Sequence, residues 1–166
     1  MSWGGLVYRP CIILAVLLVP DTAWATDATT TMGISATVLN ACVVTATSMA
    51  FGTYNPTSSS PTDATSTINV TCTPGTSFNV GLNAGGTSGA TVTTRQMLNG
   101  ATPLNYALYS NAGRTTNWGN TAGSDTVAQT ASSILPIAFT VYGRIPQQQS
   151  VGAGSYTDTV TVTVSY

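Results

Sequence analysis

Few side chains in this sequence can do acid–base, nucleophilic or metal chemistry. The 166 residues include four arginines and five aspartates but no Lys, Glu or His. Without His there is no Ser-His-Asp or Cys-His nucleophile and no His-ligated metal, and without Lys there is no Walker lysine or Schiff base. A net charge of −1 cannot neutralise a run of phosphates, which argues against nucleic acid as a partner. We therefore expect no catalytic residue, no cofactor and no metal ion.

Asp63 and Asp125 are the carboxylates that a glycoside hydrolase could in principle use as a pair. Both lie in Ser/Thr-rich stretches that we interpret as loops, and no apolar pocket pattern surrounds them. Solvated loop carboxylates are the favoured interpretation. The sequence thus predicts a protein that is not an enzyme.

The N-terminal stretch has the layout of a secretory signal peptide. Arg9 supplies a positive charge, residues 11–20 are apolar, and Ala-Trp-Ala at 23–25 matches a small-x-small cleavage site. The alternative is a membrane anchor, but a bilayer span needs about 20 apolar residues and this run is roughly half as long. We predict a signal peptide at 1–25 and export of the remaining chain.

Two cysteines, Cys42 and Cys72, remain once the signal peptide is removed. An even number of cysteines in an exported protein predicts a disulfide, with two buried thiols as the alternative. Closing a loop of about 30 residues should stabilise the fold by ~3–4 kcal/mol through the entropy of the unfolded chain.

Apolar and polar residues alternate along much of the chain, which is the period of a half-buried strand. The alternation is clearest at residues 28–38. Further candidate strands lie at residues 43–50, 68–72, 78–82, 96–98, 104–108, 134–142 and 156–166, and the polar stretches 57–66 and 111–131 are interpreted as loops. With no helical period and no internal repeat, about eight short strands predict one all-β sandwich.

The first and last candidate strands carry the functional interpretation. In the last strand, the residues predicted to face inward are Val160, Val162, Val164 and Tyr166. It has no Lys, Pro or bulge of the kind that usually protects an exposed sheet edge. In the first candidate strand, residues 28–38, the apolar residues that would lie on one face are Met32, Ile34, Ala36 and Val38. The first segment pairs either with its own chain or with a neighbouring molecule, and periodicity alone does not decide between these two alternatives.

Several short motifs match one known family in their order and spacing. They are Cys42, Phe-Gly-Thr-Tyr at 51–54, Cys-Thr-Pro-Gly at 72–75, Tyr-Ala-Leu-Tyr at 106–109, Trp-Gly at 118–119, Gly-Arg-Ile-Pro at 143–146 and Gly-Ser-Tyr-Thr-Asp at 154–158. On these motifs the chain resembles the spore coat protein U family, which contains the subunits of archaic (Csu-type) chaperone–usher pili. The likeness covers essentially the whole mature chain.

The resemblance implies an incomplete immunoglobulin-like β-sandwich, a pilin fold that lacks its last strand and is completed by a donor strand. In this family a periplasmic chaperone fills the gap temporarily, and the N-terminal strand of the next subunit replaces it at an outer-membrane usher. The implied domains are a signal peptide at 1–25, a donor-strand segment at 26–40 and a pilin domain at 41–166. The apolar residues of segment 28–38 would be the donors. The inward residues of the last strand would edge the acceptor groove and contact the chaperone.

We therefore expect a structural pilin, a shaft subunit of a surface pilus used for attachment and biofilm formation. Its expected partners are neighbouring pilin subunits, in a homo- or hetero-polymer, together with the chaperone and the usher. Burial of Met32, Ile34 and Val38 at ~1.5–3 kcal/mol each amounts to about 5–8 kcal/mol. The alternatives are a secreted, spore-coat-like structural protein that assembles without a chaperone and a monomeric sugar-binding module.

The remaining family positions are interpreted structurally. The aromatic residues predicted to lie in the core or at corners, rather than on a sugar-stacking surface, are Tyr54, Tyr106, Tyr109, Trp118 and Tyr156. Arg144 and Asp158 are predicted to form an ion pair or loop contacts. Which of the three glutamines at 147–149 matters is left open.

Overall fold

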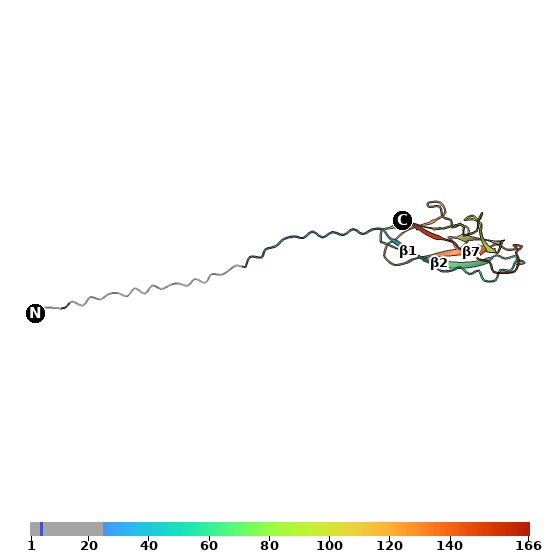
Figure 1. The fold of residues 1–166 in the computed structure, drawn as a ribbon, viewed down its shortest axis with the longest axis horizontal. Helices are drawn as coiled ribbons and strands as arrows, with labels where there is room; N and C mark the ends of the chain where they lie inside the picture. Colours follow the sequence, from blue (N-terminus) through green and yellow to red (C-terminus); the bar gives the residue numbers. More distant parts are fainter. Residues whose placement is uncertain (1–3, 5–24) are drawn as a thin grey trace. The chain divides into compact units, whose positions relative to one another are not determined.

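The structure is a computed structural model that describes residue 4 and residues 25–166. The signal peptide predicted at 1–25 lies almost wholly outside the described residues. The chain divides into two units, Met1–Ala36 and Thr37–Tyr166 (Figure 1). In the first unit, residues 25–36 form neither strand nor helix, and their side chains are exposed.

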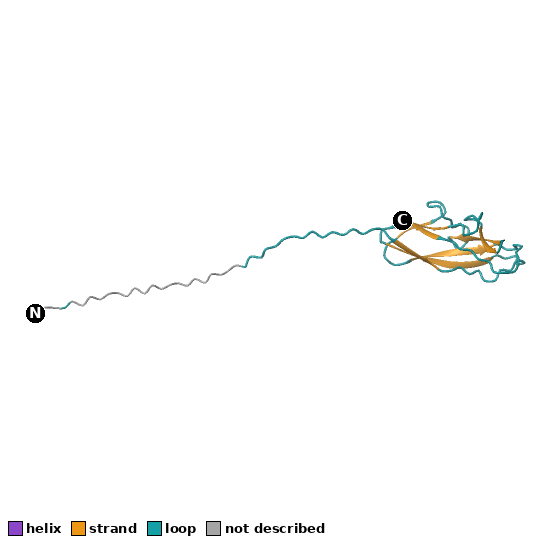
Figure 2. Ribbon diagram, in the orientation of Figure 1, coloured by secondary structure: helices purple, strands orange, loops and turns teal. Residues whose placement is uncertain are grey.

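The second unit is built from strands (Figure 2). They are β1 (Cys42–Ala46), β2 (Thr62–Cys72), β3 (Ser77–Leu82), β4 (Arg95–Asn99), β5 (Thr102–Tyr109), β6 (Val127–Thr130), β7 (Ile137–Ile145) and β8 (Val162–Ser165). One sheet has five strands in the order β1-β2-β7-β5-β4, and a second has three in the order β6-β3-β8. All strand pairs are antiparallel. The described residues contain no helix, and hence none able to cross a membrane.

The hydrophobic core is shared by the two sheets because alternate residues of each strand turn toward it. The alternate residues that β2 and β3 bury are Ile68, Val70, Phe78, Val80 and Leu82. Trp118 fills the same core, and its indole Nε1 donates a hydrogen bond to the Val80 carbonyl at 2.8 Å. The predicted all-β class is confirmed.

The predicted disulfide joins Cys42 to Cys72. The two residues face each other in the β1–β2 register, so the bond fastens the first residue of β1 to the last residue of β2. We call this the disulfide end of the unit. The opposite end, where Thr62 faces Ile145 in the β2–β7 pairing, is the distal end.

Three sequence interpretations need correction. Residues 28–38 form no strand, although their alternation is typical of one. Strand β2 begins at Thr62, so Asp63 lies in a strand and not in a loop, because β-branched Thr residues suit a strand as well as a linker. The stretch 111–131, interpreted as a loop, contains the strand β6. Asn99-Gly100 joins β4 to β5 as a hairpin turn, with Gly100 at φ 59°.

Candidate functional site

The second unit contains an open groove beside the edges of its two sheets. Strand β1 ends the five-stranded sheet and β8 ends the three-stranded sheet, and within the described residues each pairs on one side only. The groove between them has a volume of about 480 Å³. It begins at Ala46 on the β1 side and at Val162 on the β8 side.

Apolar core residues form the floor of this groove. The floor residues are Ile68, Leu82, Leu108 and Val141, all of them buried members of the core cluster. One wall is the segment 46–49 that follows β1, and the other includes Val160 and Val162. The core therefore reaches the bottom of an open groove in the described unit, at a place where a sandwich would normally have a further strand.

A second cavity of about 740 Å³ continues the groove toward the distal end. The two cavities share Met49, Phe51, Met97 and Tyr156 in their linings. The second extends to Tyr54, whose hydroxyl donates to the Pro146 carbonyl at 2.9 Å. Together they form one trench, which we call the acceptor groove.

The lining also carries polar groups, among them Tyr106 and Asp158. The Tyr106 hydroxyl donates to Asp158 Oδ2 at 2.6 Å, and Asp158 Oδ1 accepts the backbone N–H groups of Gly86 and Thr159, both at 2.8 Å. Burial, reinforced by this hydrogen bond, raises the pKa of Tyr106 far above its ordinary value. Asp158 thus accepts from the tyrosine and the loop backbone, so of the two predicted alternatives, an ion pair or loop contacts, Asp158 makes the loop contacts.

Arg144 pairs with Asp63 instead. Its Nε and Nη2 atoms donate to the two Asp63 carboxylate oxygens at 2.7 and 2.8 Å, and Arg114 lies 3.3 Å from the same carboxylate. The Arg144 hydrogen bonds lower the pKa of Asp63 below its usual range, against a smaller opposing effect of burial. Asp125, the other carboxylate considered for a hydrolase, accepts the Thr121 N–H at 2.7 Å. Nothing joins the two aspartates into a catalytic pair in the described part of the chain, which also contains no cluster of three metal-ligating residues.

Arg95 is a structural residue that sequence reasoning missed. Its side chain is fully buried and donates to four backbone carbonyls, those of Leu82, Asn83, Val92 and Trp118, at 2.7–2.8 Å. Burial lowers the pKa of Arg95. It therefore supports the end of β3, which forms part of the groove floor. A lone Arg between Thr94 and Gln96 gives no pattern from which this role could be predicted.

Comparison with known proteins agrees with this architecture. Residues 28–163 match the Spore Coat Protein U domain family. The chain belongs to this family. Protein U of Myxococcus xanthus is 33% identical over 167 residues, covering 92% of each chain. The resemblance found in the sequence motifs is confirmed.

Among solved structures, this family member is similar to one from the archaic chaperone–usher Csu pili of Acinetobacter baumannii, the CsuC–CsuE chaperone–tip adhesion subunit pre-assembly complex. The TM-score is 0.56 and the sequence identity is 24%. The match covers 78% of this chain and 41% of that chain, so this chain spans about two fifths of its length. The likeness shows a shared fold, the incomplete sandwich of a pilus subunit.

The structure places the predicted site residues of this Spore Coat Protein U protein as follows. Met32, Ile34 and Val38 are 80%, 85% and 81% exposed, and Ala36 is also exposed. Val160 and Val162 line the acceptor groove. Val164 packs against the core from β8 but is not part of the groove lining. Tyr166, predicted to face inward, is 60% exposed because β8 ends at Ser165.

The family positions predicted to be structural fall into two groups. Trp118 and Tyr106 are buried in the core, whereas Tyr54, Tyr109 and Tyr156 are partly buried. Of the three glutamines, Gln149 is the one that is tied into the fold. Its amide bonds the backbone of Asn105, and its own N–H donates to the Tyr54 hydroxyl.

Proposed function

We propose that this chain is a structural pilin subunit that polymerises by donor-strand exchange into a surface pilus. The segment 28–38 of one molecule fills the acceptor groove of the next, with Met32, Ile34, Ala36 and Val38 as donor residues. The observation that carries the proposal is the acceptor groove itself, a trench with a floor of core residues at the place where β1 ends at Ala46 and β8 begins at Val162. The family match begins at residue 28, so it includes the donor segment.

A strand is the occupant that this groove suits best. The free edges of β1 and β8 present rows of backbone N–H and C=O groups, which an added strand satisfies on both sides. Its alternate side chains would reach the floor formed by Ile68, Leu82 and Val141. A flat sugar ring or a compact ligand would leave both rows of backbone groups without partners, which costs free energy.

The positions of groove and donor lead to a head-to-tail polymer. The residues that precede β1 leave the unit at the disulfide end, whereas the groove extends from Ala46 to Tyr54 at the distal end. A donor from a neighbour entering there would run parallel to β1 and antiparallel to β8. Because the donor and acceptor surfaces differ, the contact is heterologous and continues as an open filament.

The same groove accounts for the partners that we propose. An open groove with a floor of core residues is an aggregation hazard in a free subunit, so a periplasmic chaperone would cover the groove before polymerisation at an outer-membrane usher. Such a chaperone would contact β8 and its flanking residues, which include Val160, Val162, Val164 and Tyr166. Export by the predicted signal peptide, a place in the shaft, and roles in attachment and biofilm formation belong to the same proposal.

Cross-linking tests the exchange directly. A variant carrying Ile34→Cys together with Val160→Cys or Val162→Cys should form disulfide-linked ladders between molecules on a non-reducing gel, because cross-strand neighbours have Cβ atoms about 5 Å apart. A matched control carries Ile34→Cys with Ile134→Cys, an exposed residue outside the groove lining, and should give no ladder. Only monomers in both groove variants would overturn the proposal.

The family description, Spore Coat Protein U domain, favours a second candidate, a coat-like protein that assembles without a chaperone. Refolding the purified chain alone separates the two. A pilin should stay poorly folded or aggregate until a chaperone or a donor peptide fills the groove. A coat-like protein should polymerise unaided through the same strand exchange.

A further inference from the structure

A chain that carries its own donor segment could place that segment in its own acceptor groove, which we call self-capture. Self-capture would compete with donation of the segment to a neighbouring molecule. A tethered segment has an effective concentration in the millimolar range for its own binding site, far above that of neighbouring molecules, unless geometry prevents the encounter. At about 3.3 Å per residue, segment 28–38 is long enough to turn back along β1 and reach the groove at Ala46. Length alone therefore does not prevent a subunit from filling its own groove.

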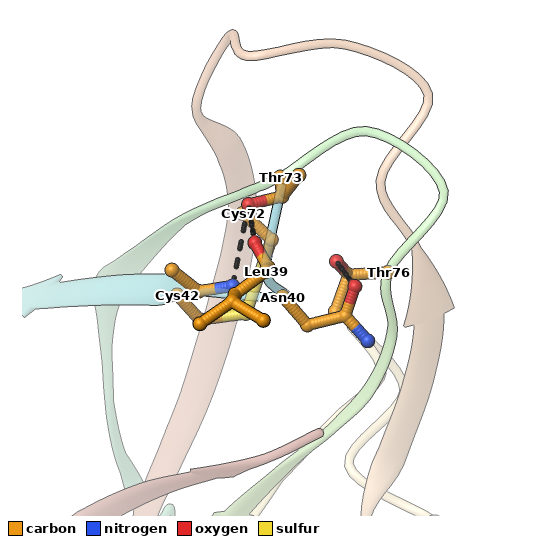
Figure 3. Close-up of a disulfide and its surroundings, with 7 residues drawn as sticks. Leu39, Asn40, Cys42, Cys72, Thr73 and Thr76 are labelled. Atoms are coloured by element: carbon orange, nitrogen blue, oxygen red, sulfur yellow. Dashed lines mark hydrogen bonds between the residues drawn. A yellow bond between two sulfur atoms is a disulfide. The ribbon is translucent and has the colours of Figure 1, made fainter. Parts of the chain in front are cut away.

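The residues that join this segment to β1 are held by a turn of the sandwich (Figure 3). We call residues 39–41 the root. The Thr73 hydroxyl donates to the Leu39 carbonyl at 3.1 Å and accepts the Ala41 N–H at 3.2 Å. The Thr73 N–H donates to the Ala41 carbonyl at 2.9 Å. Thr76, which is buried, donates through its hydroxyl to Asn40 Oδ1 at 3.2 Å.

These four hydrogen bonds fix the direction of the root. They extend the β1–β2 pairing beyond Cys42 and Cys72, so the chain continues outward past the disulfide. Self-capture requires the opposite course, a reversal at residues 39–41 that lays the segment antiparallel to β1 and parallel to β8. That reversal breaks the bonds from the Thr73 hydroxyl and from Thr76.

We propose that Thr73 and Thr76 form a clamp that disfavours self-capture and directs the donor segment to another molecule. The inference rests on the donor-strand exchange proposed above. It gives these two threonines a role in choosing the partner, in addition to holding the turn. The clamp acts on the root alone, so it should change which groove is filled and leave the strength of donor binding unchanged.

The test uses the chain with Ile34→Cys and the groove cysteine that gives ladders. Intramolecular cross-links give a monomer of altered mobility on a non-reducing gel, and intermolecular cross-links give ladders. Thr73→Val removes the hydroxyl with little change of shape, and we expect it to raise the ratio of intramolecular to intermolecular product roughly three- to tenfold. Thr73→Ser, which restores the hydroxyl, should return the ratio to that of the parent chain.

Two further variants guard against a folding defect. Asn40→Ala removes the partner of Thr76 from the exposed root without touching the turn, and it should raise the same ratio. Thr130→Val removes a hydroxyl that bonds Ser77, the residue after Thr76, and not a residue of the root, and it should leave the ratio unchanged. An unchanged ratio in both Thr73→Val and Asn40→Ala, with ladders still formed, would overturn the clamp alone. Absence of any cross-link in every variant, the parent included, would overturn the exchange and the clamp together.

Discussion

Two segments of this chain have nearly the same sequence pattern and different structures. Residues 28–38 and residues 156–166 both alternate apolar and polar side chains. The second contains β8, whose Val162 and Val164 face Leu82 and Val80 of β3 in register. In the first, Ile34 is 85% exposed and forms no strand.

The contrast shows what alternation does and does not specify. A period of two prescribes one apolar face, and it is satisfied wherever a complementary surface exists. For β8 that surface is the side of β3 within the same molecule. For residues 28–38 we propose that it is the groove of a neighbour. The pattern therefore predicts the capacity to form a strand, while the location of the partner is a property of the whole fold.

The largest expected effect comes from placing a carboxylate in each segment in turn. Ile34→Asp should abolish polymers and leave the thermal stability of the free domain unchanged, because the residue is exposed before exchange and buried after it. Val164→Asp should instead lower the free energy of unfolding of the domain itself by about 2–4 kcal/mol, since it places a charge against the core. Electron microscopy measures the polymers, and chemical denaturation of the subunit refolded with a donor peptide in its groove measures the stability.

The matched pair also separates the interpretations. Ile34→Ser introduces a polar side chain without a charge, and it should weaken assembly less than Ile34→Asp does. If Ile34→Asp destabilised the free domain as much as Val164→Asp, segment 28–38 would pair with its own chain, and the contrast between the two segments would disappear.

In stability alone, the largest effect is expected at Arg95, which supports β3 where β8 pairs with it. Arg95 bonds the carbonyls of Leu82 and Asn83, where the pairing of β3 with β8 begins. Arg95→Met keeps the bulk but leaves four buried carbonyls without donors, and it should cost about 3–5 kcal/mol of stability. Arg144→Met, on a partly exposed arginine, is the control and should cost less than about 1 kcal/mol. Equal losses of unfolding free energy for the two variants in urea denaturation would show that the burial of Arg95 adds nothing to the stability of the domain.

How far the sequence predicts this molecule depends on whether a residue acts through a repeating pattern. Val160 and Val162 face the core as their alternation predicts, and the cysteines pair as their number predicts. Arg95 could not be found, because its role depends on carbonyls from distant positions that the fold brings together. Asp63 was misplaced because a Thr-rich strand resembles a Thr-rich linker. The groove was inferred from family resemblance, since the pattern left the partner of segment 28–38 open.

Removal of the disulfide should have the next-largest effect on the stability of the domain. Cys42 and Cys72 are 30 residues apart, so opening the bond should cost about 3–4 kcal/mol through the unfolded chain. The bond lies beside the root, because Cys42 directly follows residue 41. Replacing both cysteines with Ser should therefore lower stability in chemical denaturation and also reduce assembly. A stability loss below about 1 kcal/mol would contradict the chain-entropy estimate.

The smallest expected effect lies outside both segments, in the ion pair between Asp63 and Arg144 on β2 and β7. The folded pKa of Asp63 is lowered by Arg144, so the pair's stabilisation is complete above the unfolded value of about 3.9. It should fade as pH falls through the lower, folded pKa. The carboxylate is 34% exposed, and solvent screening limits the contribution to about 0.5 kcal/mol. Asp63→Asn should remove this pH dependence of stability between about pH 4 and the folded pKa, which denaturation at several pH values measures. The substitution should leave assembly unchanged, because neither Asp63 nor Arg144 lines the acceptor groove.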